Sequence, residues 1–130
     1  PLRRKLGCKP DRVVWLVGAP AGFADYLAAE GFSSTSVEVV VDVPEGAAHV
    51  HLFTTSANVV IEAFAVLSER LDCHGQVWVS WPKKASRIAT DITKDILHNS
   101  EVAGKLVDIK VCAVDTTWSG LKYVIRKELR

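Results

Sequence analysis

The chain has 130 residues and a mass of 14.2 kDa, with 48% hydrophobic residues, 24% charged residues and a formal net charge of +1. This composition is typical of one globular domain that buries roughly two-thirds of its unfolded surface, and it excludes an intrinsically disordered chain. No apolar stretch is long enough to span a bilayer, and the basic start lacks the apolar core of a secretory signal. We therefore expect a single cytoplasmic domain over residues 1–130.

The charges are unevenly distributed along the chain. Residues 1–12 carry a net charge of +4 and residues 121–130 a net charge of +3, which leaves −6 on the segment between them. Basic ends of this kind either contact an acidic partner or simply keep the chain soluble. No dense basic run interleaved with aromatic residues is present, which argues against a nucleic-acid partner.

The three cysteines are Cys8, Cys73 and Cys112, and they form no C-x-x-C pair. Their odd number and wide spacing predict neither a disulfide framework nor a zinc site, and favour a reducing cytoplasm. Cys112 stands in an apolar run, so we expect it in the core.

The first part of the chain alternates strand and helix signals. In chain order, we expect a strand at 13–17, a helix at 23–30, a strand at 37–41 and a strand at 50–54. The first strand runs into the Gly/Pro-rich turn 18–22, and Gly31 ends the helix. Asp42 then closes the valine-rich second strand.

The second part has longer elements. In chain order, we expect a helix at 57–71, a strand at 76–81, a helix at 91–101 and strands at 107–114 and 121–125. The helix at 57–71 has apolar residues at helical spacing, and Thr90 or Asp91 is expected to cap the helix at 91–101. The last two strands are joined by a turn at 115–120.

Strands that alternate with helices predict a parallel sheet covered on both faces, a three-layer Rossmann-like α/β fold. The last connection is too short for a crossover, so the final strand must run antiparallel to its predecessor. The inferred order of the six strands is 2-1-3-4-6-5. This resembles a trimmed class I methyltransferase sheet, and the helix end at Leu71 followed by Gly75 and a strand resembles a passage of that fold.

Ligands of open α/β sheets bind beyond the carboxyl ends of the strands, near the switch point of strand order. Four loops are expected to converge there: 18–22, 54–58, 82–90 and 115–120. The candidate ligand-binding residues are Gly18, Pro20, Gly22, Trp81, Lys83, Lys84, Ser86, Thr90, Asp91, Trp118 and Ser119.

The loop 82–90 offers the chemistry of an anion site. Ser86, Thr90 and the first amides of the helix after Asp91 could cradle an anion, with two lysines as point charges. Trp118 could add a stacking plane and Ser119 a hydrogen bond. The alternative is structural: Trp81 belongs to the core and the loop is simply solvated.

Other candidate residues carry weaker signals. The turn 18–22 matches neither dinucleotide nor P-loop fingerprints, although its glycines would let a ligand approach the backbone. Asp42 is a candidate ribose-binding acid at a strand end. His49 and His51 share a strand face but lack a third ligand, so we expect no metal. No catalytic constellation is recognisable, which leaves enzymatic activity open.

Two motifs resemble those of a known family. They are W-P-K-K-x-S at 81–86 and T-W-S-G-L-K at 117–122. Both are similar to stretches in a family of small uncharacterised bacterial proteins, a domain of unknown function, whose opening also resembles residues 5–7 and 19–23. Lys94 stands where that family is expected to have an acidic residue. The resemblance implies a bacterial source and this fold, but no activity, cofactor or substrate.

Three hypotheses of function follow. The leading one is a binding or regulatory module that holds a small anionic or nucleotide-like ligand at the carboxyl edge of the sheet. The second is a minimal transferase with S-adenosylmethionine as its cofactor, in which Asp42 binds the ribose and the turn 18–22 lies against the methionine part. The third is a domain that binds a protein or nucleic acid through its basic ends.

Overall fold

The computed structural model describes residues 13–130, so Cys8, the basic start and the motif at 5–7 lie outside the described residues. The strands are β1 (Val14–Val17), β2 (Ser34–Val37), β3 (Ala47–Phe53), β4 (Leu71–Pro82), β5 (Leu106–Ala113) and β6 (Trp118–Ile125). The helices are α2 (Phe23–Ala29), α3 (Ala57–Arg70), α4 (Lys94–Leu97) and α5 (Ser100–Ala103), with single 3-10 turns η1 (Val40–Asp42), η2 (Lys84–Ser86) and η3 (Lys127–Leu129). None of the helices within 13–130 has the length and apolar character needed to cross a membrane.

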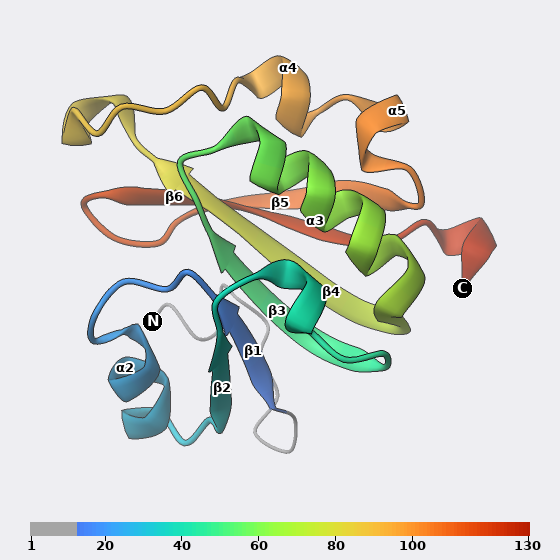
Figure 1. Cartoon of the computed structure of the whole chain (residues 1–130), viewed down its shortest axis with the longest axis horizontal. Helices are drawn as coiled ribbons and strands as arrows, with labels where there is room; N and C mark the ends of the chain where they lie inside the picture. The colour runs from blue at the N-terminus through green and yellow to red at the C-terminus, as the bar shows by residue number, and fades with distance from the viewer. Residues whose placement is uncertain (1–12) are drawn as a thin grey trace.

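The strands form a six-stranded sheet in the order β2-β1-β3-β4-β6-β5, as predicted (Figure 1). β1 pairs with β2 and β3 in parallel, and β3 with β4 in parallel, whereas β6 runs antiparallel to both β4 and β5. The short β5–β6 connection imposes this reversal, because parallel neighbours need a crossover of a dozen or more residues.

Helices cover the two faces of the sheet separately. α3 begins at Ser56, whose side chain accepts a hydrogen bond from the Val59 amide, and buries Phe64 and Leu67 against one face. The other face carries a second apolar cluster, to which α2 contributes Phe23 and Leu27. The sheet therefore has a separate core on each side, the three-layer arrangement that alternating strands and helices predict.

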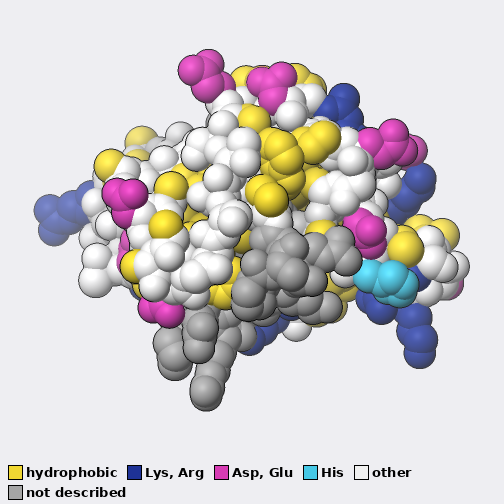
Figure 2. Space-filling model, turned by 90° about the horizontal axis from the view of Figure 1, so that it is seen from below, with side chains coloured by type: hydrophobic (Ala, Val, Ile, Leu, Met, Phe, Trp, Pro, Cys, Tyr) yellow, Lys and Arg dark blue, Asp and Glu magenta, His cyan; other side chains and the backbone are white. Residues whose placement is uncertain are grey.

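The predicted second strand at 37–41 is wrong. β2 ends at Val37, and Val40 lies in the 3-10 turn η1, where it is buried in the core beneath α3. β2 is an edge strand with one neighbour, so its serines and threonine can face solvent, which hides it from a search for apolar runs. Asp42 lies in the same 3-10 turn and therefore does not stand at a strand end. Figure 2 views the molecule from the β2 side and shows apolar side chains exposed among acidic ones.

The predicted helix at 91–101 is also wrong. The chain forms two four-residue helices, and α4 begins at Lys94, capped by Thr93, which accepts from the Ile96 amide. The Tyr123 hydroxyl donates to the Leu97 carbonyl at 2.6 Å, where α4 ends. Burial, and secondarily the nearby Asp108 carboxylate, raise the pKa of the Tyr123 phenol, so it remains a donor at neutral pH.

Three strands are longer than expected. β3 begins at Ala47, β4 begins at Leu71, where α3 has just ended, and β6 begins at Trp118. Trp118 and Ser119 therefore lie in a strand and not in the predicted turn at 115–120. As expected, Cys112 is buried.

Candidate functional site

The carboxyl edge of the sheet brings the four predicted loops together. Val17 pairs with Leu52 where β1 and β3 end. The Thr54 amide donates to the Ser80 carbonyl at 3.1 Å, and the Lys83 amide donates to the Thr117 carbonyl at 2.8 Å. The loops after β1, β3 and β4 and the β5–β6 turn thus share one edge, where open α/β sheets bind ligands.

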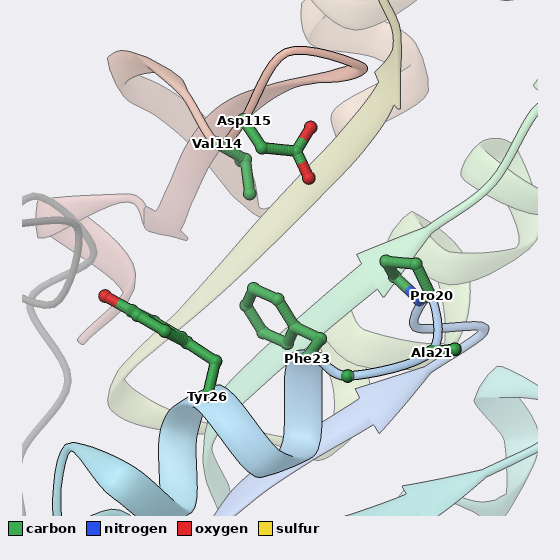
Figure 3. Close-up of a pocket in the computed structure, with 7 residues that line it drawn as sticks. Pro20, Ala21, Phe23, Tyr26, Val114 and Asp115 are labelled. Carbon is green, nitrogen blue, oxygen red and sulfur yellow. The ribbon is translucent and has the colours of Figure 1, made fainter.

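A pocket of about 450 Å³ lies on the α2 side of this edge (Figure 3). The described residues that line it are Pro20, Ala21, Gly22, Phe23, Tyr26, Val114 and Asp115. Figure 3 shows Val114 and Asp115, at the β5–β6 turn, across the pocket from the side chains of α2 and its preceding turn. The pocket is large enough for a small organic ligand, whose sites usually occupy about 300–1,000 Å³.

Two glycines shape the turn after β1. Gly18 has φ +67°, and a Cβ there would lie 2.6 Å from the Phe53 carbonyl oxygen. Gly22 has φ +90°, but a Cβ there would meet no atom within 4 Å. Packing against β3 therefore requires glycine at position 18, whereas position 22 borders open space on the pocket wall.

Packed aromatic rings, which we call the aromatic wall, lie between the pocket and the sheet. The Phe23 ring lies edge-on to Phe53 and to His51, with centroid distances of 4.9 Å and 5.0 Å. Phe53 in turn packs edge-on against Trp118 at 5.3 Å. Tyr26 lies one helical turn along α2 from Phe23, with the two ring centroids 6.1 Å apart. Because Phe23 is fixed by these contacts, the wall is rigid where it meets the pocket.

Among the described residues that line the pocket, Asp115 is the one carboxylate. Its Oδ1 accepts hydrogen bonds from the Thr117 amide at 2.7 Å and the Trp118 amide at 2.8 Å. This side-chain turn fixes the aspartate at the tip of the β5–β6 connection.

His51 and Ser80 form a buried polar pair behind the aromatic wall. His51 Nε2 lies 2.8 Å from Ser80 Oγ, and both residues are almost fully buried. Burial lowers the pKa of His51 to about 3, so its imidazole is neutral at physiological pH. Residues 13–130 contain no cluster of three or more His, Cys, Asp or Glu side chains arranged to hold a metal, His49 and His51 included.

The loop 82–90 uses its predicted anion-binding groups to hold its own structure. Ser86 Oγ donates to the Lys83 carbonyl and Thr90 Oγ1 to the Thr55 carbonyl, each at 2.6 Å. Asp91 Oδ1 accepts from the Ala57 amide at 2.6 Å, at the start of α3. The predicted helix after Asp91, whose amides were to cradle an anion, begins only at Lys94. A ligand role for this loop stays a prediction.

The predicted site residues divide into two groups in space. Pro20 and Gly22 line the pocket, Gly18 supports its turn, and Trp118 packs behind it. The members of the other group lie outside the lining; these are Trp81, Lys83, Lys84, Ser86, Thr90, Asp91 and Ser119. Sequence reasoning missed Phe23, Tyr26, Val114 and Asp115. The available signal was that Asp115 belongs to the loop 115–120, already expected at the carboxyl edge, and that Phe23 and Val114 adjoin loops expected there.

No protein-family model and no curated protein matches this chain in sequence. Solved structures do match it in fold. The structure of a putative type 11 methyltransferase from Sulfolobus solfataricus matches with a TM-score of 0.66 and 12% identity, over 97% of this chain and 90% of that one. A TehB-like S-adenosylmethionine-dependent methyltransferase from Corynebacterium glutamicum matches with a TM-score of 0.62 and 11% identity, over 92% of this chain and 83% of that one.

A third solved structure is a geranyl diphosphate methyltransferase in complex with S-adenosylmethionine. It has a TM-score of 0.63 and 11% identity, over 95% of this chain and 82% of that one. At such identities the likeness shows the fold alone. The chain thus has a methyltransferase-like Rossmann fold, which confirms the predicted fold class.

Proposed function

We propose that this protein binds S-adenosylmethionine or its demethylated product at the carboxyl edge of the sheet. The observation that carries the proposal is the position of the pocket, which opens beside the turn after β1, next to the strand-order switch between β1 and β3. Two solved structures that match in fold are complexes, one with S-adenosylmethionine and one with its demethylated product.

Glu38 supplies a group for the ribose in place of Asp42. Val17 of β1 pairs with Val37 of β2, so Gly18 and Glu38 follow adjacent strand ends. Rossmann-like folds place an acid about 20 residues after the first glycine, where its carboxylate hydrogen-bonds a ribose hydroxyl. Glu38 is exposed and has this spacing from Gly18.

The turn 18–22 fits a ligand that approaches the backbone. Open space faces Gly22, and the adjoining pocket is mostly apolar. The turn 18–22 and Glu38 would hold the nucleoside-containing ligand, which when bound supplies an activated methyl group. This chain's part in such a reaction is positioning, because methyl transfer depends chiefly on the placement of the acceptor.

Isothermal titration calorimetry of the full chain with S-adenosylhomocysteine tests the proposal. We expect saturable binding of one ligand per chain, weakened about tenfold by Glu38→Gln, because a hydrogen bond to a charged group contributes about 1.5 kcal/mol or more. Asp42→Asn is the matched control, since it removes a nearby carboxylate that ends no strand, and it should bind as the wild type does.

Absence of binding at millimolar ligand would overturn the proposal. Equal losses in Glu38→Gln and Asp42→Asn would reject the assigned ribose contact. If the protein binds the ligand, incubation with labelled S-adenosylmethionine and candidate acceptors tests for methyl transfer. This second experiment distinguishes a transferase from a binding module.

A further inference from the structure

We infer that the pocket between α2 and the β5–β6 turn takes an organic cation, an alkylated ammonium or sulfonium group. The inference deepens the proposed function and rests on it for the identity of the neighbouring ligand. It differs from the anionic ligand that the sequence favours, and the reason lies in the pocket lining.

Among residues 13–130, the lining carries a negative charge. Asp115 is its one charged side chain in that part of the chain, whereas Lys83 and Lys84 lie outside the lining. Within residues 13–130, no lysine or arginine forms an ion pair with Asp115, whose Oδ1 is engaged by two backbone amides. An anion would meet a carboxylate here, whereas a cation would meet its counter-charge.

Two aromatic rings face the same space. The centroids of Phe23 and Tyr26 are 6.1 Å apart and their planes are inclined by 38°, so the rings form a shallow corner. A cation within about 6 Å of an aromatic ring centroid is attracted by the ring quadrupole, which is how proteins recognise quaternary ammonium groups. In Figure 3 these rings lie across the pocket from Asp115.

The apolar remainder of the lining selects the kind of cation. Pro20, Ala21 and Val114 offer methyl and methylene surface. A small hydrated ion would lose water here without replacement ligands, whereas an alkylated cation buries its methyl groups favourably. Carboxylate, rings and aliphatic wall together fit a group with diffuse positive charge and an apolar shell.

Two sources share this chemistry. One is the sulfonium of S-adenosylmethionine itself, held beside the turn 18–22. The other is the ammonium group of a second ligand that binds next to the nucleoside. We test the shared chemistry with choline and its neutral isostere 3,3-dimethylbutan-1-ol.

The experiment follows backbone amide shifts by NMR during titration of the full chain with each probe. We expect choline to bind about tenfold more tightly than the alcohol, with the largest shifts at Tyr26 and Asp115. Asp115→Asn retains the oxygen that accepts from Thr117 and Trp118 but loses the charge, and should reduce the preference to less than about threefold. Asp25→Asn, a carboxylate of α2 outside the lining, should leave it unchanged.

A second pair of variants tests the ring. Tyr26→Phe retains the aromatic face and should keep the preference for choline. Tyr26→Leu retains apolar volume without a ring and should lower it several-fold. Equal binding of choline and the alcohol by the wild type, or equal effects of the two Tyr26 variants, would overturn the inference.

S-adenosylhomocysteine separates this inference from the proposed function, because its thioether is uncharged. If S-adenosylhomocysteine binds but choline is not preferred over the alcohol, the cation site alone is overturned. If choline is preferred but S-adenosylhomocysteine does not bind, the proposed function alone is overturned. Competition between choline and S-adenosylmethionine would identify the sulfonium as the cation, whereas simultaneous binding would identify the ammonium of a second ligand.

Discussion

The face of the sheet beneath α3 is packed largely with aliphatic side chains, whereas the face beneath α2 has a larger share of aromatic rings. The covering helices differ as well, with 14 residues in α3 and 7 in α2. The short α2 leaves the pocket open between its first turns and the β5–β6 turn. If the pocket binds the proposed ligand, we expect mutations in the larger α3 core to lower stability without changing affinity.

Phe64→Ala should give the largest loss of stability. Phe64 of α3 is 1% exposed and packs edge-on against Tyr123 at 4.8 Å. Removing the ring leaves a cavity in the α3 core and should lower the free energy of unfolding by about 4 kcal/mol. Urea denaturation measures this loss, and Ile61→Ala, on the exposed side of the same helix, should lose less than about 1 kcal/mol.

The same variant tests the separation of the two faces. Without urea, and at a low temperature at which Phe64→Ala is still folded, the affinity of the variant for S-adenosylhomocysteine should equal that of the wild type. A loss of affinity in the folded variant would show that the α3 core also shapes the ligand site.

Gly18→Ala should rank next. An alanine there must adopt φ +67° and place its Cβ 2.6 Å from the Phe53 carbonyl oxygen, which together should cost about 3 kcal/mol. Gly22→Ala has the same backbone strain but meets open space, so it should cost only about 1 kcal/mol. Equal costs in thermal unfolding would mean that the contact with β3 relaxes freely.

The sheet order could be predicted because it needs only the apolar runs and the lengths of the connections. A crossover cannot fit between β5 and β6, so the reversal follows from the chain itself. β2 could not be found in this way, because Ser34–Val37 is a mostly polar edge strand whereas the more apolar run after it forms η1. Val40 of this run joins the α3 core, whereas Val39 and Val41 are exposed, and periodicity does not reveal which valine is buried.

The sequence predicted the position of the candidate site at the carboxyl edge, but not most of the residues that line it. The carboxyl edge follows from topology, which is why Pro20 and Gly22 were identified. Tyr26 and Asp115 come from elements far apart in sequence, and their approach depends on how α2 packs on the sheet. Ser86 and Thr90 are residue types typical of an anion site. In the structure each hydroxyl donates to a backbone carbonyl, and composition alone does not show this.

His51 predicts a pH effect on the aromatic face. Its folded-state pKa of about 3 lies below the unfolded value near 6.5, so from about one pH unit above 6.5 the residue is neutral in both states and contributes no pH dependence. As the pH falls from 6.5 towards 3, the unfolded state gains a proton that the folded state does not. Stability is therefore lost, by about 2 kcal/mol at pH 5.

Urea denaturation of the wild type and His51→Gln at several pH values isolates this contribution. Glutamine does not titrate, so the stability difference between the two proteins should be constant from about one pH unit above 6.5 and shift by about 2 kcal/mol in favour of the variant at pH 5. A constant difference over the whole range would show that His51 is protonated without cost.

Lys83 and Lys84 should give the smallest effect, and they separate the two parts of the carboxyl edge. Both lie outside the pocket lining. Each surface ammonium contributes about 0.5 kcal/mol to holding an anion, so the two lysines together contribute about 1 kcal/mol, or about fivefold in affinity, and less in high salt. We therefore expect the double change to alanine to weaken binding of inorganic pyrophosphate up to about fivefold and to leave S-adenosylhomocysteine binding unchanged. A larger loss of S-adenosylhomocysteine affinity would mean that the loop 82–90 and the pocket hold one ligand between them.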